Sequence, residues 1–224
     1  MILLAVDTTT PAGSVALLEN KHLRAEINVE SSLNFSERLL PSVDFLLKTS
    51  KIPAENITGF ALAVGPGSFT GIRVGISTVL SFSFASGKQV APVSALEALA
   101  LKIKDPYHRL LCPMIDAKKG EIYTCLYEVK GGRFVELFPP GATTPDFFIS
   151  SLPRRRTIHF IGSGTRVYGE KIRDYMGDKA RFSRRSLFVA HEVGLLGYEL
   201  FSQGKAVSME KVKPLYYRKS QAEE

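Results

Sequence analysis

The first 30 positions alternate between short apolar blocks and turn residues, a pattern that predicts strands. Ile2–Val6 is a continuous apolar run, typical of a buried strand. Ser14–Leu18 and Arg24–Val29 predict two further strands, joined by a turn at Glu19–His22. A loop rich in turn residues, 7–13, separates the first strand from this hairpin. The chain therefore opens with a three-stranded β unit.

The period of the apolar residues then changes to that of a helix, over residues 34–48. The residues that recur at this spacing are Leu39, Leu40, Val43, Leu46 and Leu47. Pro41 falls inside the pattern and lacks the N–H group that a helix interior uses. We therefore expect a helix that either starts late or kinks at Pro41.

A glycine-rich string separates the next strand from a second helix. The strand is Phe60–Val64, the string is Gly65-Pro66-Gly67-Ser68-Phe69-Thr70-Gly71, and the helix extends to about Ser86. Its apolar face holds Ile72, Ile76, Val79 and Leu80, while Phe82 and Phe84 point to different sides. A short strand at Val90–Pro92 and a helix at Ala95–Ile103, capped by Ser94, follow.

The same order of elements then begins again. Leu110–Ile115 predicts a buried strand that ends at Asp116, and a hairpin follows with strands at Glu121–Val129 and Arg133–Leu137. After an irregular proline-rich stretch, a strand at Ile158–Ile161 leads into Gly162-Ser163-Gly164-Thr165 and a helix through Arg173. Asp7 matches Asp116, and the string that begins at Gly65 matches the one that begins at Gly162.

This repetition predicts an α/β protein with two similar β-β-β-α domains. We place the first at residues 1–104 and the smaller second one at 105–188, with 189–224 packing back on the body through a helix at His191–Phe201. A duplicated unit of this kind, with an Asp ending its first strand, resembles the actin, sugar-kinase and chaperone-ATPase (ASKHA) superfamily. That resemblance implies a nucleotide cleft between the domains.

Composition narrows the class of protein. Hydrophobic residues make up 45% of the 224 residues and the net charge is +7, with small basic groups at Lys118-Lys119, Arg154-Arg155-Arg156 and Arg184-Arg185. These charges are compatible with a nucleic-acid partner, but a solvated loop is the favoured interpretation for each group taken alone. No apolar run approaches the length that spans a bilayer, and an acid follows the first apolar run at once. We expect a cytoplasmic protein with no membrane contact.

Residues for catalysis are sparse. Cys112 and Cys125 lie in apolar stretches without metal-ligand spacing, and we expect both to be small core residues. His191-Glu192 begins like a zinc-protease motif, but the second ligand position is Leu195. His191 is therefore better placed in the first turn of its helix.

The glycine strings allow two interpretations. Backbone N–H groups at a helix N-terminus bind phosphate, whereas glycine also permits a tight turn and close packing. We favour packing, because one glycine-rich loop is a weak phosphate signal, and treat the set as a vestigial nucleotide cleft. Its residues are Asp7, Thr8, Gly65, Gly67, Ser68, Asp116, Gly162 and Gly164.

The string Gly65–Gly71, continuing through Arg73 to Gly75, together with Asp116–Tyr123, closely resembles the TsaB (YeaZ) family. Segments at Ala5–Thr8, Ser36–Pro41, Val93–Glu97 and Tyr216–Arg218 extend the resemblance over the chain. Phe35 departs from it, since relatives commonly have histidine there. The family assists synthesis of threonylcarbamoyladenosine next to the anticodon of certain tRNAs.

In the catalytic paralogue TsaD, a helix carries a histidine pair that holds a metal. The matching positions here are Ala95 and Leu99, which have no lone pairs for a metal. The resemblance thus implies a non-catalytic subunit without a metal or cofactor of its own, although ATP could bind at the complex interface. The implied partners are TsaD, the ATPase TsaE, tRNA through the complex and, for the free chain, a second copy.

Relatives pair through the first two helices, so we expect a partner interface there. Its predicted residues are Leu39, Leu40, Val43, Leu47, Ile72, Ile76, Val79 and Leu80. Two alternatives stay open: an active cleft enzyme, either a peptidase or a small-molecule kinase, and a nucleotide-sensing binding module that acts without TsaD.

Overall fold

The computed structural model describes residues 1–30, 35–105 and 109–218. The chain forms two compact units, of which the first contains 1–98 and 188–216 and the second contains 99–187 and the residues from 217 onward. The division thus falls after Ala98, inside the helix α3 (Ala95–Lys102), whereas the prediction placed it after 104. Asn34, His108 and the tail from 219 lie outside the described residues.

The first unit is built on a five-stranded sheet in the order β3-β2-β1-β4-β5. Its strands are β1 (Ile2–Asp7), β2 (Ala12–Glu19), β3 (His22–Glu30), β4 (Gly59–Gly65) and β5 (Val90–Ser94). β1, β2 and β3 pair antiparallel, whereas β4 and β5 run parallel to β1. The central strands β1 and β4 are apolar, apart from Asp7 at the end of β1, because both of their faces are covered.

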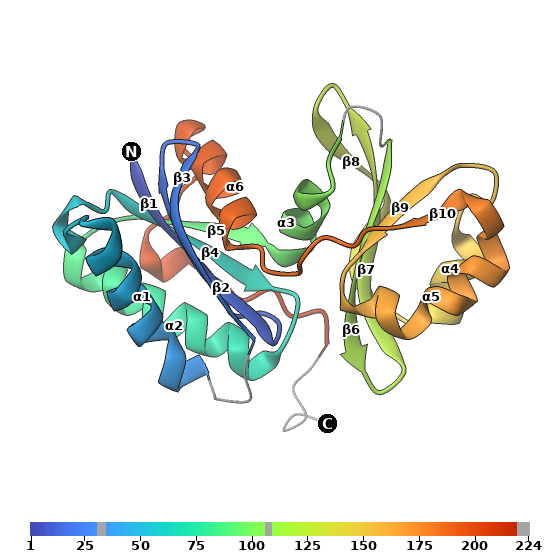
Figure 1. Cartoon of the computed structure of the whole chain (residues 1–224), viewed down its shortest axis with the longest axis horizontal. Coiled ribbons are helices and arrows are strands. Elements are labelled where there is room, and N and C mark those ends of the chain that lie inside the picture. Colours follow the sequence, from blue (N-terminus) through green and yellow to red (C-terminus); the bar gives the residue numbers. More distant parts are fainter. Residues whose placement is uncertain (31–34, 106–108, 219–224) are drawn as a thin grey trace. The chain divides into compact units, whose positions relative to one another are not determined.

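Helices cover the two faces of this sheet (Figure 1). α1 (Phe35–Ser50) and α2 (Phe69–Ser86) lie on one face, and α6 (Ala190–Ser202) lies on the other. α1 already includes residue 35 and continues past the exposed Pro41, so it does not start late. Gly197 lets α6 approach the sheet closely, since a Cβ there would lie 2.4 Å from that of Ala61.

The second unit repeats this plan, which confirms the predicted duplication. Its sheet has the order β10-β9-β6-β7-β8, and α4 and α5 pack on it. The elements are β6 (Leu110–Lys118), β7 (Glu121–Lys130), β8 (Arg133–Thr143), α4 (Pro145–Ser151), β9 (Ile158–Ile161), α5 (Ser163–Met176) and β10 (Ala180–Phe182). Short 3₁₀ turns complete the chain at η1 (Ala54–Asn56), η2 (Gly177–Lys179) and η3 (Met209–Lys211).

One prediction for this unit was wrong, and one strand was missed. The stretch expected to be irregular continues as β8 through Pro139 and Pro140 and then forms α4, and β10 was not predicted. β8 lies at the edge of its sheet, and its pairing with β7 shifts register between Phe138 and Gly141. The two prolines therefore fall at an irregularity of an edge strand, where proline is tolerated. Three-residue β10 is too short for a pattern of alternating residues to reveal it.

None of the helices in the described part of the chain is long and apolar enough to cross a membrane.

Candidate functional site

The residues of the predicted cleft are divided between the two units. Asp7, Thr8 and the glycine string from Gly65 belong to the first unit, and Asp116 with the string from Gly162 belongs to the second. Each group of residues is therefore described within its own unit.

Asp7, the last residue of β1, is a buried carboxyl with one unused oxygen. Asp7 is only 1% exposed. Its Oδ1 accepts hydrogen bonds from the backbone N–H (2.9 Å) and the hydroxyl Oγ1 (2.6 Å) of Thr9. Oδ2 has no hydrogen-bond partner among the described residues. Burial raises the pKa of Asp7 from 3.8 to about 6, and the bonds from Thr9 offset only part of that effect.

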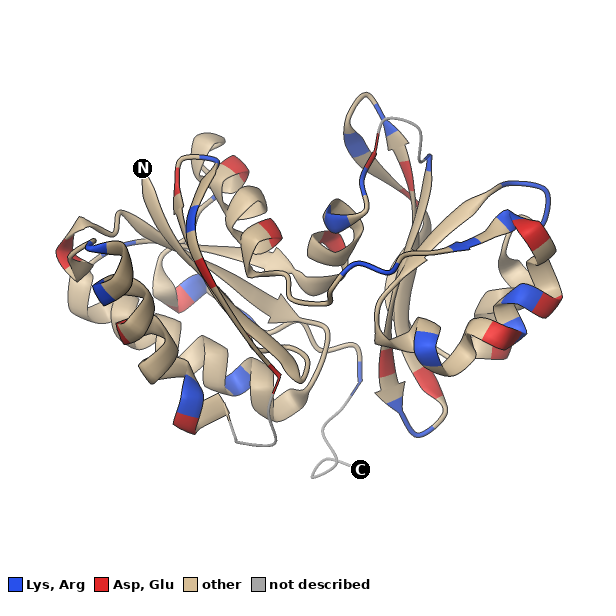
Figure 2. Ribbon diagram, in the orientation of Figure 1, with Lys and Arg blue, Asp and Glu red and all other residues tan. Residues whose placement is uncertain are grey.

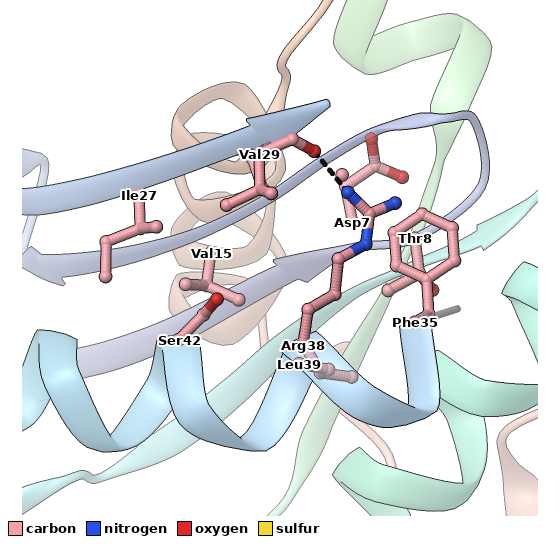
Figure 3. A pocket seen from close by; sticks show the side chains of 11 residues that line it. Asp7, Thr8, Val15, Ile27, Val29, Phe35, Arg38, Leu39 and Ser42 are labelled. Atoms are coloured by element: carbon pink, nitrogen blue, oxygen red, sulfur yellow. Dashed lines mark hydrogen bonds between the residues drawn. The ribbon is translucent and has the colours of Figure 1, made fainter. Parts of the chain in front are cut away.

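A cavity of about 20 Å³ adjoins Asp7, with β2, β3 and α1 as its walls (Figure 3). Arg38 closes it by donating from Nη1 to the carbonyl of Val29 (2.6 Å) and from Nη2 to that of Pro11 (3.2 Å). The guanidinium lies 4.0 Å from the centre of the Phe35 ring. The cavity has room for about one water molecule, which could serve the unused oxygen of Asp7, but not for a nucleoside.

Phe35, the position that departs from relatives, has a packing role in this unit. Its ring lies against Gly13, where a Cβ would come within 2.2 Å of the ring carbon Cε1. Phe35 therefore fills space beside Asp7 and supports Arg38 through its ring face.

The glycine string before α2 packs against the end of β1. A Cβ at Gly67 would lie 2.1 Å from the carbonyl oxygen of Thr9, and one at Gly71 would lie 2.0 Å from that of Thr8. Thr8 Oγ1 donates to the carbonyl of Gly71 (2.7 Å), which fixes this approach. Close packing thus accounts for these glycines, in agreement with the favoured interpretation.

Hydrogen bonds within the unit use groups that a phosphate would need at the start of α2. The N–H of Ser68 donates to the carbonyl of Thr9 (2.7 Å), and the Ser68 hydroxyl accepts from the N–H of Gly71 (3.3 Å) as the helix cap. Gly65 adopts a φ of 123° and leaves no room for a side chain, since a Cβ would lie 2.5 Å from the carbonyl oxygen of Leu215. Groups of the same unit therefore occupy much of the space at the N-terminus of α2 in which a phosphate would bind.

The second unit repeats this arrangement. Gly162 has a φ of 116°, and a Cβ there would lie 2.1 Å from the carbonyl oxygen of Met114 in β6. Gly164 also packs on Met114, and Ser163 Oγ accepts from the N–H of Asp116 (3.0 Å). The Asp116 carboxylate is paired with Lys118, with 2.8 Å between Oδ2 and Nζ. Both glycine strings thus secure a helix to the first strand of their sheet.

The described residues hold no group of three or more His, Cys, Asp or Glu side chains that could bind a metal. Ala95 and Leu99, which match the histidine positions of the paralogue, are buried on α3. Cys112 is fully buried beside Thr124, and burial raises the pKa of its thiol to about 12. At neutral pH this thiol is therefore not a nucleophile.

Half of the predicted partner interface is core, which corrects the prediction. Leu39, Val43, Ile72 and Val79 are each at most 5% exposed and pack inside the first unit. The prediction chose these residues from the helical spacing of apolar side chains, and that spacing identifies the side of each helix that packs on its own sheet. Leu47, Ile76 and Leu80 are half-buried, whereas Leu40 is 53% exposed.

Two exposed aromatic residues were missing from the predicted interface. Phe45 of α1 is 63% exposed and Phe84 of α2 is 76% exposed. The sequence did separate Phe84 from Phe82, and Phe82 indeed packs inward, 6.1 Å from the ring of Phe60. Leu47, Ile76 and Leu80 pack against the core of the unit. We therefore define the α1–α2 outer surface as the exposed residues Leu40, Phe45 and Phe84.

The repeated sheets and the paired glycine strings define a two-domain α/β protein with the fold of the actin, sugar-kinase and chaperone-ATPase proteins. Similarity to a ROK hexokinase from Thermus thermophilus shows the same fold, with a TM-score of 0.51 and 12% identity over 91% of this chain and 100% of that one. Closer similarities identify the family.

The family model "TsaD: tRNA N6-adenosine threonylcarbamoyltransferase" matches residues 27–146, more than half of the chain. The tRNA threonylcarbamoyladenosine biosynthesis protein TsaB of Bacillus subtilis is 28% identical over 226 residues, covering 100% of this chain and 96% of that protein. YeaZ from Pseudomonas aeruginosa superposes with a TM-score of 0.82 and 27% identity, over 96% of this chain and 99% of that one. The chain belongs to this family, within its TsaB (YeaZ) branch.

Proposed function

We propose that this chain is a non-catalytic subunit of a complex that forms threonylcarbamoyladenosine next to the tRNA anticodon. It binds the catalytic subunit TsaD and supports its active arrangement, and it helps to recruit the ATPase TsaE. The relatives named as tRNA threonylcarbamoyladenosine biosynthesis proteins support the pathway.

The observation that carries a role as a binding subunit is the α1–α2 outer surface. Three large apolar side chains on two neighbouring helices, Leu40, Phe45 and Phe84, each expose more than half of their area. Exposed apolar side chains gathered on adjoining elements are typical of protein interfaces, and aromatic residues contribute strongly to binding there. We place the contact with TsaD on this surface.

The positions that a peptidase or kinase would use for catalysis carry unsuitable residues, which favours a role as a subunit. Ala95 and Leu99 offer no ligand to a metal, and the Cys112 thiol stays protonated at neutral pH. Asp7 is enclosed beside a cavity of about 20 Å³. We therefore propose that the threonylcarbamoyl transfer and its metal belong to TsaD, and that any ATP binds where subunits of the complex meet.

The same surface offers a contact for a second copy when TsaD is absent. We propose that the free chain forms a homodimer through Leu40 and Phe84 and that TsaD replaces one copy. The complex would act in the cytoplasm, where tRNA is modified.

Co-purification with TsaD tests the proposal. Phe84→Glu and Leu40→Glu should each weaken binding by at least about tenfold, because a charge would be desolvated at an apolar contact. The matched control is Phe147→Glu on α4, which alters a residue that is also 63% exposed but lies in the second unit.

If the Phe84 and Leu40 variants fold and bind TsaD as tightly as the wild type does, the contact lies elsewhere. If the wild-type chain does not bind TsaD at all, the proposed function is wrong.

A further inference from the structure

The charge of the protein is unevenly divided between its two units. The first unit holds 10 Lys and Arg residues against 11 Asp and Glu, a net charge of −1, and the second holds 19 against 11, a net charge of +8. Together they give the +7 of the whole chain. The basic character that composition alone assigns to the protein therefore belongs to the second unit.

Many of these charges gather at one end of the second sheet. β9 and β10 are parallel neighbours with Ile158 opposite Ala180, so the segments that enter them lie at the same end. The residues 153–157 enter β9, and η2 enters β10 directly after α5. Figure 2 shows Lys and Arg on the loop before β9 and along α5 and β10.

We define the β9–β10 basic edge as the cationic residues of the loop before β9, the last turn of α5, η2 and β10. They are Arg154, Arg155, Arg156, Arg173, Lys179 and Arg181. All except the half-buried Lys179 are exposed.

Aromatic rings hold two of these arginines without neutralising them. The guanidinium of Arg154 lies 3.8 Å from the centre of the Tyr175 ring, and that of Arg173 lies 4.5 Å from the centre of the Phe182 ring. A guanidinium stacked on a ring keeps its charge and loses less side-chain entropy when it binds an anion.

Carboxylates neutralise only part of the basic edge. Arg156 bonds to Glu128, and Lys179 lies 3.8 Å from Asp178. In the described part of the chain, none of the other four arginines forms an ion pair with a carboxylate. Edge strands often carry charges to prevent aggregation, which one arginine on β10 would satisfy. Arg173 lies in the last turn of α5, where a cation interacts favourably with the helix dipole. The charges of the loop before β9 have neither explanation.

We propose that the β9–β10 basic edge binds the phosphate backbone of the tRNA on which the complex acts. This inference rests on the proposed function for the identity of the RNA. Guanidinium groups suit phosphate because their planar donors can form two parallel hydrogen bonds. The contact is to the backbone and carries no base specificity, so it orients the RNA while sequence recognition falls to other parts of the complex.

The test is binding of fluorescently labelled tRNA by the full chain, followed by anisotropy as the salt concentration is raised. The triple variant Arg154→Gln, Arg155→Gln, Arg181→Gln removes three charges from the basic edge. The control Lys21→Gln, Lys48→Gln, Lys51→Gln removes three exposed charges from the first unit.

We expect the triple variant to bind tRNA at least about tenfold more weakly than the wild type at low salt. The slope of the logarithm of the binding constant against the logarithm of the salt concentration should become less steep by about 2 to 3. The control should stay within about twofold of the wild type. Equal tRNA affinity of the triple variant and the wild type would overturn the inference. So would a salt slope unchanged by the variant, or binding of anionic vesicles, but not tRNA, through these residues.

TsaD binding is measured with the same proteins, which separates this inference from the proposed function. The triple variant should bind TsaD like the wild type, because its substitutions lie outside the α1–α2 outer surface. A wild-type chain that binds tRNA through the basic edge but never TsaD would refute the proposed function alone.

Discussion

Replacing Asp7 by asparagine would remove a buried charge and keep the oxygen that accepts from Thr9. The carboxyl is enclosed, and its Oδ2 has no partner among the described residues. Because burial raises the pKa from 3.8 to about 6, the folded protein holds a proton between these pH values that the unfolded chain has released.

The sign of the effect follows from this difference in proton binding. Stability falls as the pH rises from about 4 to 6, and above pH 6 the full cost of the buried carboxylate is present. A pKa displaced from 3.8 to about 6 is equivalent to about 3 kcal/mol. Asparagine carries no charge at any pH, so its advantage over Asp7 should grow from near zero at pH 4 toward that value at pH 7.

The assay is urea denaturation of both proteins across this pH range. Asp44→Asn is the matched control, because the Asp44 side chain is 60% exposed and its ion pair with Lys48 is at the surface. The control should remain within about 0.5 kcal/mol of the wild type throughout. A variant at Asp7 that is destabilised at pH 7 would show that the ionised carboxylate stabilises the unit, and the reasoning would be wrong.

Three further results are expected. Gly71→Ala should lower the free energy of unfolding by about 2 kcal/mol in urea, because the added Cβ meets the Thr8 carbonyl at 2.0 Å, and a loss below about 0.5 kcal/mol would contradict that packing. Cys112 should resist an aromatic disulfide reagent until the protein unfolds, since it is 0% exposed and its pKa is about 12; rapid labelling of the native protein would refute this. Val79→Glu should unfold the first unit, as judged by circular dichroism, whereas Phe84→Glu should not, because Val79 is 0% exposed and Phe84 is 76% exposed.

The duplicated fold could be predicted because each unit repeats one series of strong local signals. Apolar runs of strand length, two hairpins and a glycine string before each helix recur in the same order. The misses lie where tertiary context decides. Pro139 and Pro140 suggested irregular structure, but they lie at a register shift of an edge strand, where proline is tolerated.

The candidate surface was only partly predictable from the sequence. Helical periodicity finds the apolar stripe of a helix, and that stripe faces its own sheet. Val43 and Val79 were therefore assigned to an interface although they are core residues. Phe45 and Phe84 lie outside this stripe, on the otherwise polar side of their helices. A large apolar residue at such a position is the sequence feature that would have identified them.

Formation of threonylcarbamoyladenosine by TsaD, with this chain supplied as a separate component, tests the central claim most directly. The mixture contains tRNA, TsaE and a carbamoyl-adenylate as the donor of the threonylcarbamoyl group. The account predicts product with the wild-type chain and with Asp7→Asn, little product with Phe84→Glu, and none without the chain. Full product with Phe84→Glu, or threonylcarbamoyl transfer by this chain in the absence of TsaD, would contradict it.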